Sequence, residues 1–190
     1  MNAAAAEAAE VRRHARRLLS AAEVAAALGR MAEEIRLRLA HADPVVVAAM
    51  HGGVFTAVEL CKHFDFPYQF SYVHAGRYGS GFAGGSLEWQ AAPPPWLAGR
   101  HVLLVDDILD GGLTLAALEC SLRTAGAREV HKAVLIIKDL EPPQERPSVA
   151  FAGAHIPDVF VFGCGMDYKG YWRGLPELWA IAHAPETGGT

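Results

Sequence analysis

The stretch His101-Val-Leu-Leu-Val-Asp106-Asp107-Ile-Leu-Asp110-Gly111-Gly112-Leu113-Thr114 decides the fold. Its continuous apolar run, 102–105, is typical of a strand that is covered on both faces of a parallel sheet. We expect this strand to end on Asp106 and Asp107, because a third acid, two glycines and a threonine follow at once. Residues 115–127 then carry apolar side chains at helical spacing, which predicts a helix.

The turn between this strand and this helix belongs at the carboxyl edge of the predicted sheet. Open α/β folds bind their ligands at that edge. Glycines let backbone N–H groups approach a ligand closely, and the N-terminus of the following helix attracts anions. The sequence therefore predicts a phosphate site with three carboxylates beside it, which suit sugar hydroxyls, a metal ion or a transferable proton.

The rest of the chain alternates between helical and strand patterns. We expect helices at 5–19, 21–40 and 54–64, and strands at 44–50, 66–73, 86–90, 131–138, 160–163 and 178–183. Ser20 followed by Glu23 predicts a capping box at the second helix. Strands that alternate with helices indicate an α/β fold with a mostly parallel sheet. The glycine-rich segment 75–85, with Arg77 and Tyr78, predicts a mobile loop or lid.

Length and composition are typical of a soluble single-domain enzyme. The 190 residues suit one domain with a full core, and 52% hydrophobic residues with a net charge of -4 are ordinary for a soluble enzyme. The charge argues against a nucleic-acid partner, because the one basic cluster, 12–17, is expected to be the solvated face of a helix. No apolar stretch reaches the length of a membrane span, and the acidic start of the chain is unlike a signal peptide, so we expect no membrane partner.

The three cysteines favour a reducing compartment. Cys61, Cys120 and Cys164 lie far apart and form no CxxC pair, which argues against a disulfide framework or a zinc site. We expect Cys61 and Cys120 to be small packing residues on helices, and the protein to be cytoplasmic.

The run from His101 to Thr114 resembles the phosphoribosyl-pyrophosphate (PRPP) motif of type I phosphoribosyltransferases. Asp110 stands where branches that act on 6-oxopurines carry Asp, whereas adenine, uracil and orotate branches usually carry Ala or Thr. Three further segments resemble the hypoxanthine-guanine branch in the same order along the chain. They are the loop 50–53, Lys138 at a strand end, and the segment 158–176, so the resemblance covers roughly residues 45–181.

The resemblance implies the α/β phosphoribosyltransferase fold. This fold is Rossmann-like, with a mostly parallel sheet flanked by helices and a small hood. It implies a single domain over 1–190. We expect N-terminal helices over about 1–43, a core over 44–150, and a purine-binding hood with C-terminal strands over 151–184.

By this resemblance, one set of residues binds PRPP. Asp106 and Asp107 would hold the ribose hydroxyls, although one of them could instead cap a helix or loop. The other PRPP-binding residues would be His51, Gly52, Gly53, Asp110, Gly111, Gly112, Leu113, Thr114 and Arg173. Two of these positions depart from the family, which usually has Thr or Ser in place of Gly111 and often Lys in place of His51. Relatives frequently have a cis peptide bond before that position.

A second set would handle the base and the metal. Asp110 would be the catalytic proton acceptor, with loop capping as the alternative. Lys138 would donate to the O6 carbonyl of the purine, Phe160 would stack on it unless it packs in the core, and Val161 would offer backbone contacts. Asp167 would also bind at the purine site and would hold Mg²⁺ together with Asp106.

The resemblance implies purine salvage by a Mg²⁺-dependent glycosyltransferase. It would move the phosphoribosyl group from PRPP to N9 of hypoxanthine or guanine, giving IMP or GMP and pyrophosphate, under a lid that includes Arg77 and Tyr78. A homodimer or homotetramer is the family expectation. Two alternatives remain open here: a catalytically silent nucleotide sensor on the same fold, and an enzyme that prefers xanthine or a pyrimidine.

Overall fold

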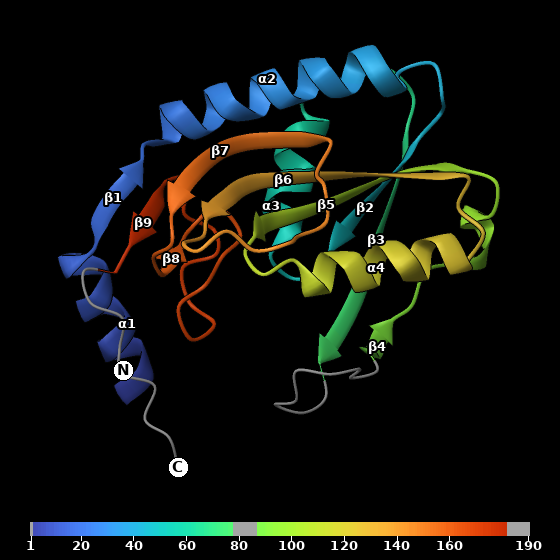
Figure 1. The fold of residues 1–190 in the computed structure, drawn as a ribbon. Coiled ribbons are helices and arrows are strands. Elements are labelled where there is room, and N and C mark those ends of the chain that lie inside the picture. Colours follow the sequence, from blue (N-terminus) through green and yellow to red (C-terminus); the bar gives the residue numbers. More distant parts are fainter. Residues whose placement is uncertain (1, 78–86, 182–190) are drawn as a thin grey trace.

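A six-stranded sheet forms the centre of the molecule in the computed structural model, which describes residues 2–77 and 87–181 (Figure 1). Its strand order is β4-β3-β2-β5-β6-β7. The strands are β2 (Val45–Ala49), β3 (Gln69–Arg77), β4 (Leu87–Ala91), β5 (His101–Leu109), β6 (Glu129–Asp139) and β7 (Phe151–Pro157). Only β4 is antiparallel to its neighbour, so the predicted mostly parallel α/β sheet is confirmed.

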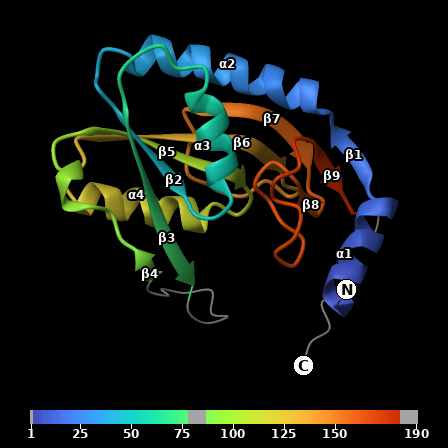
Figure 2. The same ribbon diagram turned by 180° about the vertical axis from the view of Figure 1, so that it is seen from behind.

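Helices cover both faces of this sheet. Side chains of α2 (Ala21–Leu39) and α3 (Gly53–Cys61) pack on one face, and those of α4 (Leu113–Thr124) pack on the other. Figures 1 and 2 show α4 and α3 on these opposite sides, and the short helix η1 (Pro95–Leu97) precedes β5. Alternate residues of 102–105 enter the two cores, which explains the continuous apolar run of that strand.

A second, smaller sheet lies at one end of the central sheet and forms the hood. It has the order β1-β9-β8 and consists of β1 (Arg16–Leu19), β8 (Val161–Phe162) and β9 (Leu178–Ala180). Helix α1 (Ala3–His14) precedes β1 and packs its Ala8 among the aromatic residues of this end of the molecule.

The N-terminal third departs from the predicted pattern at one point. The helix expected over 5–19 ends at His14, because Ala15 is extended and Arg16–Leu19 form a strand. This strand finds its hydrogen-bond partners in β9, far along the chain, so local helical periodicity could not reveal it. The basic cluster is therefore divided between α1 and β1. The predicted boundaries shift too, since β1 belongs to the hood and β7 to the central sheet.

Other predictions hold with changed limits. The capping box of α2 is confirmed, since Ser20 and Glu23 exchange both hydrogen bonds. The segment 75–77 is the end of β3, not a loop, because it pairs with β4. The rest of the predicted lid, including Tyr78, lies outside the described residues. No helix in the described ranges is long and apolar enough to span a membrane.

The cysteines are free, but one expectation about them was wrong. Cys61 is partly buried against the core that includes α2 and α3, as expected of a packing residue. Cys120 is exposed on α4, because it lies on the solvent side of that helix.

Candidate functional site

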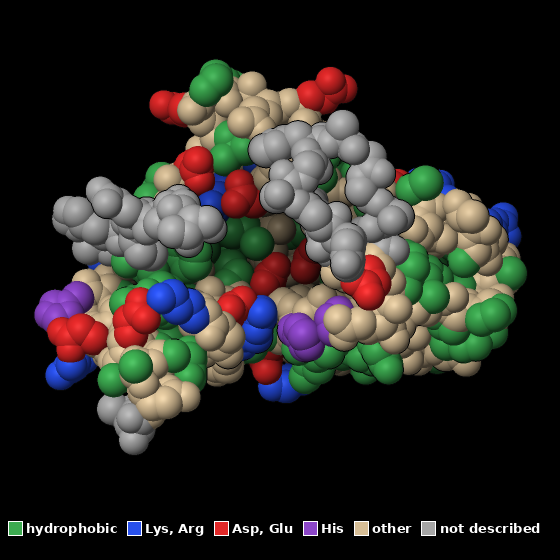
Figure 3. All heavy atoms as spheres, turned by 90° about the horizontal axis from the view of Figure 1, so that it is seen from below, with side chains coloured by type: hydrophobic (Ala, Val, Ile, Leu, Met, Phe, Trp, Pro, Cys, Tyr) green, Lys and Arg blue, Asp and Glu red, His purple; other side chains and the backbone are tan. Residues whose placement is uncertain are grey.

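A pocket of about 440 Å³ opens at the carboxyl edge of the central sheet. Figure 3 views the molecule from below and shows acidic side chains at the bottom of a hollow near its centre. The predicted motif supplies much of the lining, which includes Gly52, Asp106, Asp107, Asp110, Gly111, Gly112, Leu113 and Thr114. The fold thus brings these residues, from the turn after β2 and from β5 to α4, to one cavity.

The two adjacent acids lie within β5, not at its end as predicted. β2 pairs with β5 only as far as Val105, whereas β6 stays paired with β5 as far as Leu109. The edge of β5 that faced β2 therefore has no strand partner from Asp106 onward. Both Asp106 and Asp107 line the pocket for this reason, although the strand continues.

The acid pair is electrostatically strained. Asp107 is only 9% exposed, and its backbone N–H donates to Asp106 Oδ1 over 3.0 Å. Burial raises the pKa of Asp106 well above its usual range, and the neighbouring charge of Asp107 raises it further. Burial also raises the pKa of Asp107. Hydroxyl donors or a cation placed here would relieve the cost of holding two carboxylates together.

The turn between β2 and α3 approaches these acids through glycines. A side chain at Gly52 would overlap the carboxylate of Asp107, and one at Gly53 would overlap the backbone of β5. The Met50–His51 peptide bond that leads into this turn is cis. The His51 ring is exposed and meets the ring of His74 edge-on, at 4.4 Å between centroids.

Arg146, which was not a predicted site residue, ties the turn before α4 to the end of β6. Arg146 Nη1 donates to the backbone carbonyls of Lys138, Asp110 and Leu109 over 2.7, 3.2 and 3.4 Å. Gly112, at φ +77°, directly precedes the helix. Arg146 lies in the proline-rich crossing 141–147, whose composition predicts a turn but gives no sign of this role.

Lys138 and Asp110 meet at the end of β6. Lys138 Nζ donates to Asp110 Oδ2 over 2.9 Å and to Asp158 Oδ1 over 3.1 Å, while the lysine side chain is only 12% exposed. Burial alone would lower the pKa of Lys138, but the two carboxylates outweigh burial and raise it. Lys138 and Asp110 were predicted site residues, whereas Asp158, the first residue of the segment that resembles the family, was not.

Phe160 and Phe162 have different surroundings. Phe160 is 43% exposed and meets the ring of Tyr168 edge-on at 6.1 Å between centroids. Phe162 is fully buried, and Val161 is buried beside it in β8. The core-packing alternative for Phe160 is therefore wrong, and its ring is accessible to a ligand.

Asp167 and Arg173 form an ion pair over 2.5 Å between Oδ1 and Nη2. Arg173 Nη1 also donates to the Gly165 carbonyl over 2.7 Å, and the Gly170 N–H donates to Asp167 Oδ2 over 2.5 Å. A side chain at Gly165 would overlap the carbonyl of Gly52, so the hood and the turn after β2 touch through backbone atoms. Asp167 and Arg173 were predicted site residues, whereas Gly165 was not.

Helix α1 is hydrogen-bonded to the loop 167–173. Glu7 accepts hydrogen bonds from the Tyr168 hydroxyl over 2.6 Å and from Lys169 Nζ over 2.7 Å. The Trp172 indole N–H donates to the Ala8 carbonyl over 2.9 Å. The loop that carries Asp167 and Arg173 is thus pinned to a helix that precedes the hood.

The site offers oxygen ligands of the kind that Mg²⁺ prefers. Asp106 and Asp107 fit this ion well, because both are carboxylates whose buried charge a cation would offset. Asp167 fits less directly, since Arg173 and the Gly170 N–H already engage its two oxygens.

A sequence profile for the family described as "Phosphoribosyl transferase domain" matches residues 14–169. The chain belongs to the phosphoribosyltransferase family. Among curated phosphoribosyltransferases, the hypoxanthine phosphoribosyltransferase of Salmonella typhimurium is 30% identical over 167 residues, which cover 85% of this chain and 92% of that protein. The hypoxanthine-guanine-xanthine phosphoribosyltransferase of Tritrichomonas foetus is 28% identical over 136 residues, which cover 72% of this chain and 74% of that protein.

A solved structure shares the fold. The hypoxanthine-guanine phosphoribosyltransferase of Bacillus anthracis has a TM-score of 0.74 at 24% identity, covering 87% of this chain and 96% of that one. The predicted membership of the hypoxanthine-guanine branch of type I phosphoribosyltransferases is confirmed by these relatives together.

Proposed function

We propose that this enzyme transfers the 5-phosphoribosyl group of PRPP to N9 of hypoxanthine or guanine, which yields IMP or GMP and pyrophosphate. The names of its relatives support a purine substrate. The observation that carries the choice of a 6-oxopurine is the contact between Lys138 and Asp110 at the edge of the acid-lined pocket. It puts an ammonium donor and a carboxylate side by side.

The pocket supplies groups for each part of PRPP. Asp106 and Asp107 would accept hydrogen bonds from the ribose hydroxyls. The backbone of 111–113 and the first turn of α4, with Thr114, would bind the 5′-phosphate at the helix N-terminus. Backbone N–H groups of the β2–α3 turn, which Gly52 and Gly53 allow to lie close against β5, would bind pyrophosphate, and the guanidinium of Arg173 suits its oxygens.

The base would bind against Lys138. An ammonium group only donates, so it pairs with a carbonyl at position 6 and has nothing to accept from an adenine amino group. An incoming O6 would replace one carboxylate on Lys138 Nζ, while Asp158 remains as the other. Phe160 would stack on the base, because its ring is exposed at this end of the hood.

Asp110 would then act on the base proton. In the reaction the N9–C1′ bond forms, the C1′–oxygen bond to pyrophosphate breaks, and the proton lost by the base passes to the Asp110 carboxylate. Release from Lys138 leaves that carboxylate able to accept a hydrogen bond from N7. Mg²⁺, when bound by Asp106 with Asp167 or water, would neutralise charge on the leaving pyrophosphate.

Xanthine is a second candidate base, because the name of one relative includes it. The assay that separates the candidates measures pyrophosphate release and nucleotide formation with hypoxanthine, guanine, xanthine, adenine and uracil, with and without Mg²⁺. We expect turnover with the first two bases and dependence on the ion. No turnover with any base would contradict the proposal.

The role of Asp110 has its own test. Asp110→Asn should lower kcat by about 10²- to 10⁴-fold, the usual contribution of a general base, while the protein stays folded. Asp65→Asn, at an exposed acid after α3, is the matched control and should leave kcat unchanged. Turnover of Asp110→Asn near the wild-type rate would remove the proton acceptor from the proposal.

A further inference from the structure

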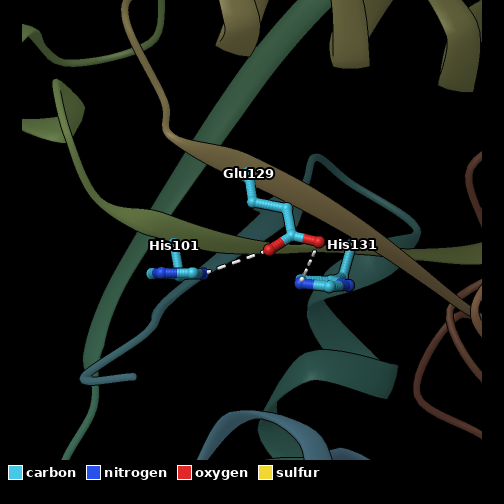
Figure 4. Close-up of side chains that lie close together, drawn as sticks. All are labelled: His101, Glu129 and His131. Atoms are coloured by element: carbon cyan, nitrogen blue, oxygen red, sulfur yellow. Dashed lines mark ion pairs between the residues drawn. The ribbon is translucent and has the colours of Figure 1, made fainter.

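Three potential metal ligands meet at the opposite, amino-terminal edge of the sheet. His101 begins β5, and Glu129 and His131 lie near the start of β6 (Figure 4). His101 pairs in register with Glu129, and His131 lies two residues further along β6, on the same face of the sheet. The fold thus fixes the backbone positions of all three side chains.

The distances between these side chains suit a metal ion better than hydrogen bonds. His131 Nε2 lies 3.3 Å from Glu129 Oε1, and His101 Nδ1 lies 3.5 Å from Glu129 Oε2. Hydrogen bonds from N–H to oxygen are commonly about 2.9–3.0 Å long. Two ligands of a tetrahedral zinc ion with bonds of about 2.0–2.1 Å are separated by about 3.3 Å. One potential ligand atom from each residue lies within 4.8 Å of the other two.

The surroundings leave one imidazole nitrogen unshared and leave space beside the cluster. His101 Nδ1 is buried and has no hydrogen-bond partner among the residues that the structure describes. The His131 side chain is buried, and Arg38 lines the same pocket. Neutral imidazole is the form that binds metals. The pocket around the cluster has a volume of about 400 Å³, which leaves room for water ligands.

We propose that His101, Glu129 and His131 bind a divalent transition-metal ion, with zinc preferred. Two imidazoles and one carboxylate are a donor set that zinc accepts, with water in the fourth position. This set is too rich in nitrogen for Mg²⁺, which prefers oxygen ligands. The cysteine count argued against zinc, but this site needs no cysteine. It depends on strand register, which the sequence alone does not give.

A bound ion would tie the first residues of β5 to those of β6. This site lies at the sheet edge opposite the PRPP pocket, so we assign it a stabilising role and no part in phosphoribosyl transfer. An ion that binds the folded chain and not the unfolded one raises stability by mass action.

The test uses tag-free protein freed of metal with a chelator. Zinc is titrated by calorimetry in excess Mg²⁺, which occupies the oxygen-rich acids of the PRPP pocket. We expect one zinc ion per chain and a rise of several degrees in Tm when free zinc greatly exceeds its Kd. No binding, or no rise in Tm, would overturn the proposal.

Variants locate the binding. Glu129→Gln removes a half-exposed ligand with little risk to folding, and should weaken zinc binding at least tenfold, as should His101→Asn. His63→Asn, an exposed histidine outside the cluster, should change nothing, and Arg38→Gln should tighten binding by removing a nearby positive charge. Activity in Mg²⁺ alone should persist in Glu129→Gln. Unchanged zinc affinity in both Glu129→Gln and His101→Asn would place the ion elsewhere and overturn the proposal.

Discussion

Lys138 donates a hydrogen bond to Asp110 across 2.9 Å, so the proposed base-binding donor and the proposed proton acceptor are partners of each other before a base arrives. An incoming 6-oxopurine must replace this contact with one to each residue. The ion pair therefore holds both groups in position and ready for exchange.

Replacing Lys138 tests its role in base selection. Lys138→Gln should lower kcat/KM for hypoxanthine by roughly 10- to 100-fold, the value of one hydrogen bond from a charged donor. Discrimination against adenine should shrink as well, because an amide can also accept a hydrogen bond. Steady-state kinetics with both bases measure this. Lys62→Gln, at the exposed lysine that follows the last residue of α3, is the control, and equal selectivity in wild type and Lys138→Gln would refute the assignment.

The acid pair predicts a conflict between stability and activity. The pKa of Asp106 is raised in the folded protein, so the folded chain binds this proton more readily than the unfolded chain. The group therefore costs stability at pH values above its unfolded pKa of about 3.9, and the full cost is present above its raised folded pKa. Asp106→Asn should raise stability by about 1 kcal/mol at pH 7, or roughly 2–4 °C in Tm, while activity falls.

The pH dependence of that gain identifies its cause. As the pH falls through the raised pKa of Asp106, the wild-type carboxylate takes up a proton and the advantage of Asp106→Asn should disappear. Thermal melts of both proteins across a pH series measure this. A gain in Tm that is the same at every pH would mean that packing, not charge, is responsible.

Replacement of glycine by alanine should have opposite effects on stability at Gly52 and at Gly29. Gly52→Ala places a methyl group against the Asp107 carboxylate and should destabilise the protein by about 1–3 kcal/mol and impair activity. Gly29→Ala, within α2 and with free space around it, should stabilise by about 0.5–1 kcal/mol. Chemical denaturation gives both values. A tolerated Gly52→Ala would show that the turn after β2 can move away from β5.

The contact of α1 with the loop 167–173 predicts an effect on the leaving-group side of the site. Glu7→Ala removes the acceptor of Tyr168 and Lys169 and should raise KM for PRPP several-fold, with a smaller change in kcat. Glu10→Ala, one turn further along α1 and paired only within that helix among the described contacts, is the control. Equal KM values for the two variants would contradict a role of α1 in holding the loop.

Much of the fold was predictable because its signals are local. The buried strand 102–105, the capping box at Ser20 and the alternation of strands with helices all follow from neighbouring residues. The motif from Asp106 to Thr114 likewise forms one wall of the pocket, because it is contiguous in the chain. Lys138, which was selected by resemblance, meets Asp110 because β5 and β6 pair in parallel as far as Leu109 and Ile137.

What sequence analysis missed depends on contacts between distant segments. β1 is a strand because β9 pairs with it, about 160 residues away, and β5 continues past Asp106 because β6 still pairs with it. Arg146 has its role because its guanidinium donates to backbone carbonyls such as that of Lys138, and Asp158 because it accepts a hydrogen bond from the Lys138 ammonium group. No periodicity or spacing within the sequence encodes such partners.

Helix α1 lies almost entirely before residue 14, where the match to the family profile begins. It nevertheless fastens the loop that carries Asp167 and Arg173. Sequence change in α1 could therefore alter how readily pyrophosphate leaves, while every residue that contacts substrate stays the same. Grafting this helix onto a relative would change the rate of pyrophosphate release there without transferring any residue that contacts substrate.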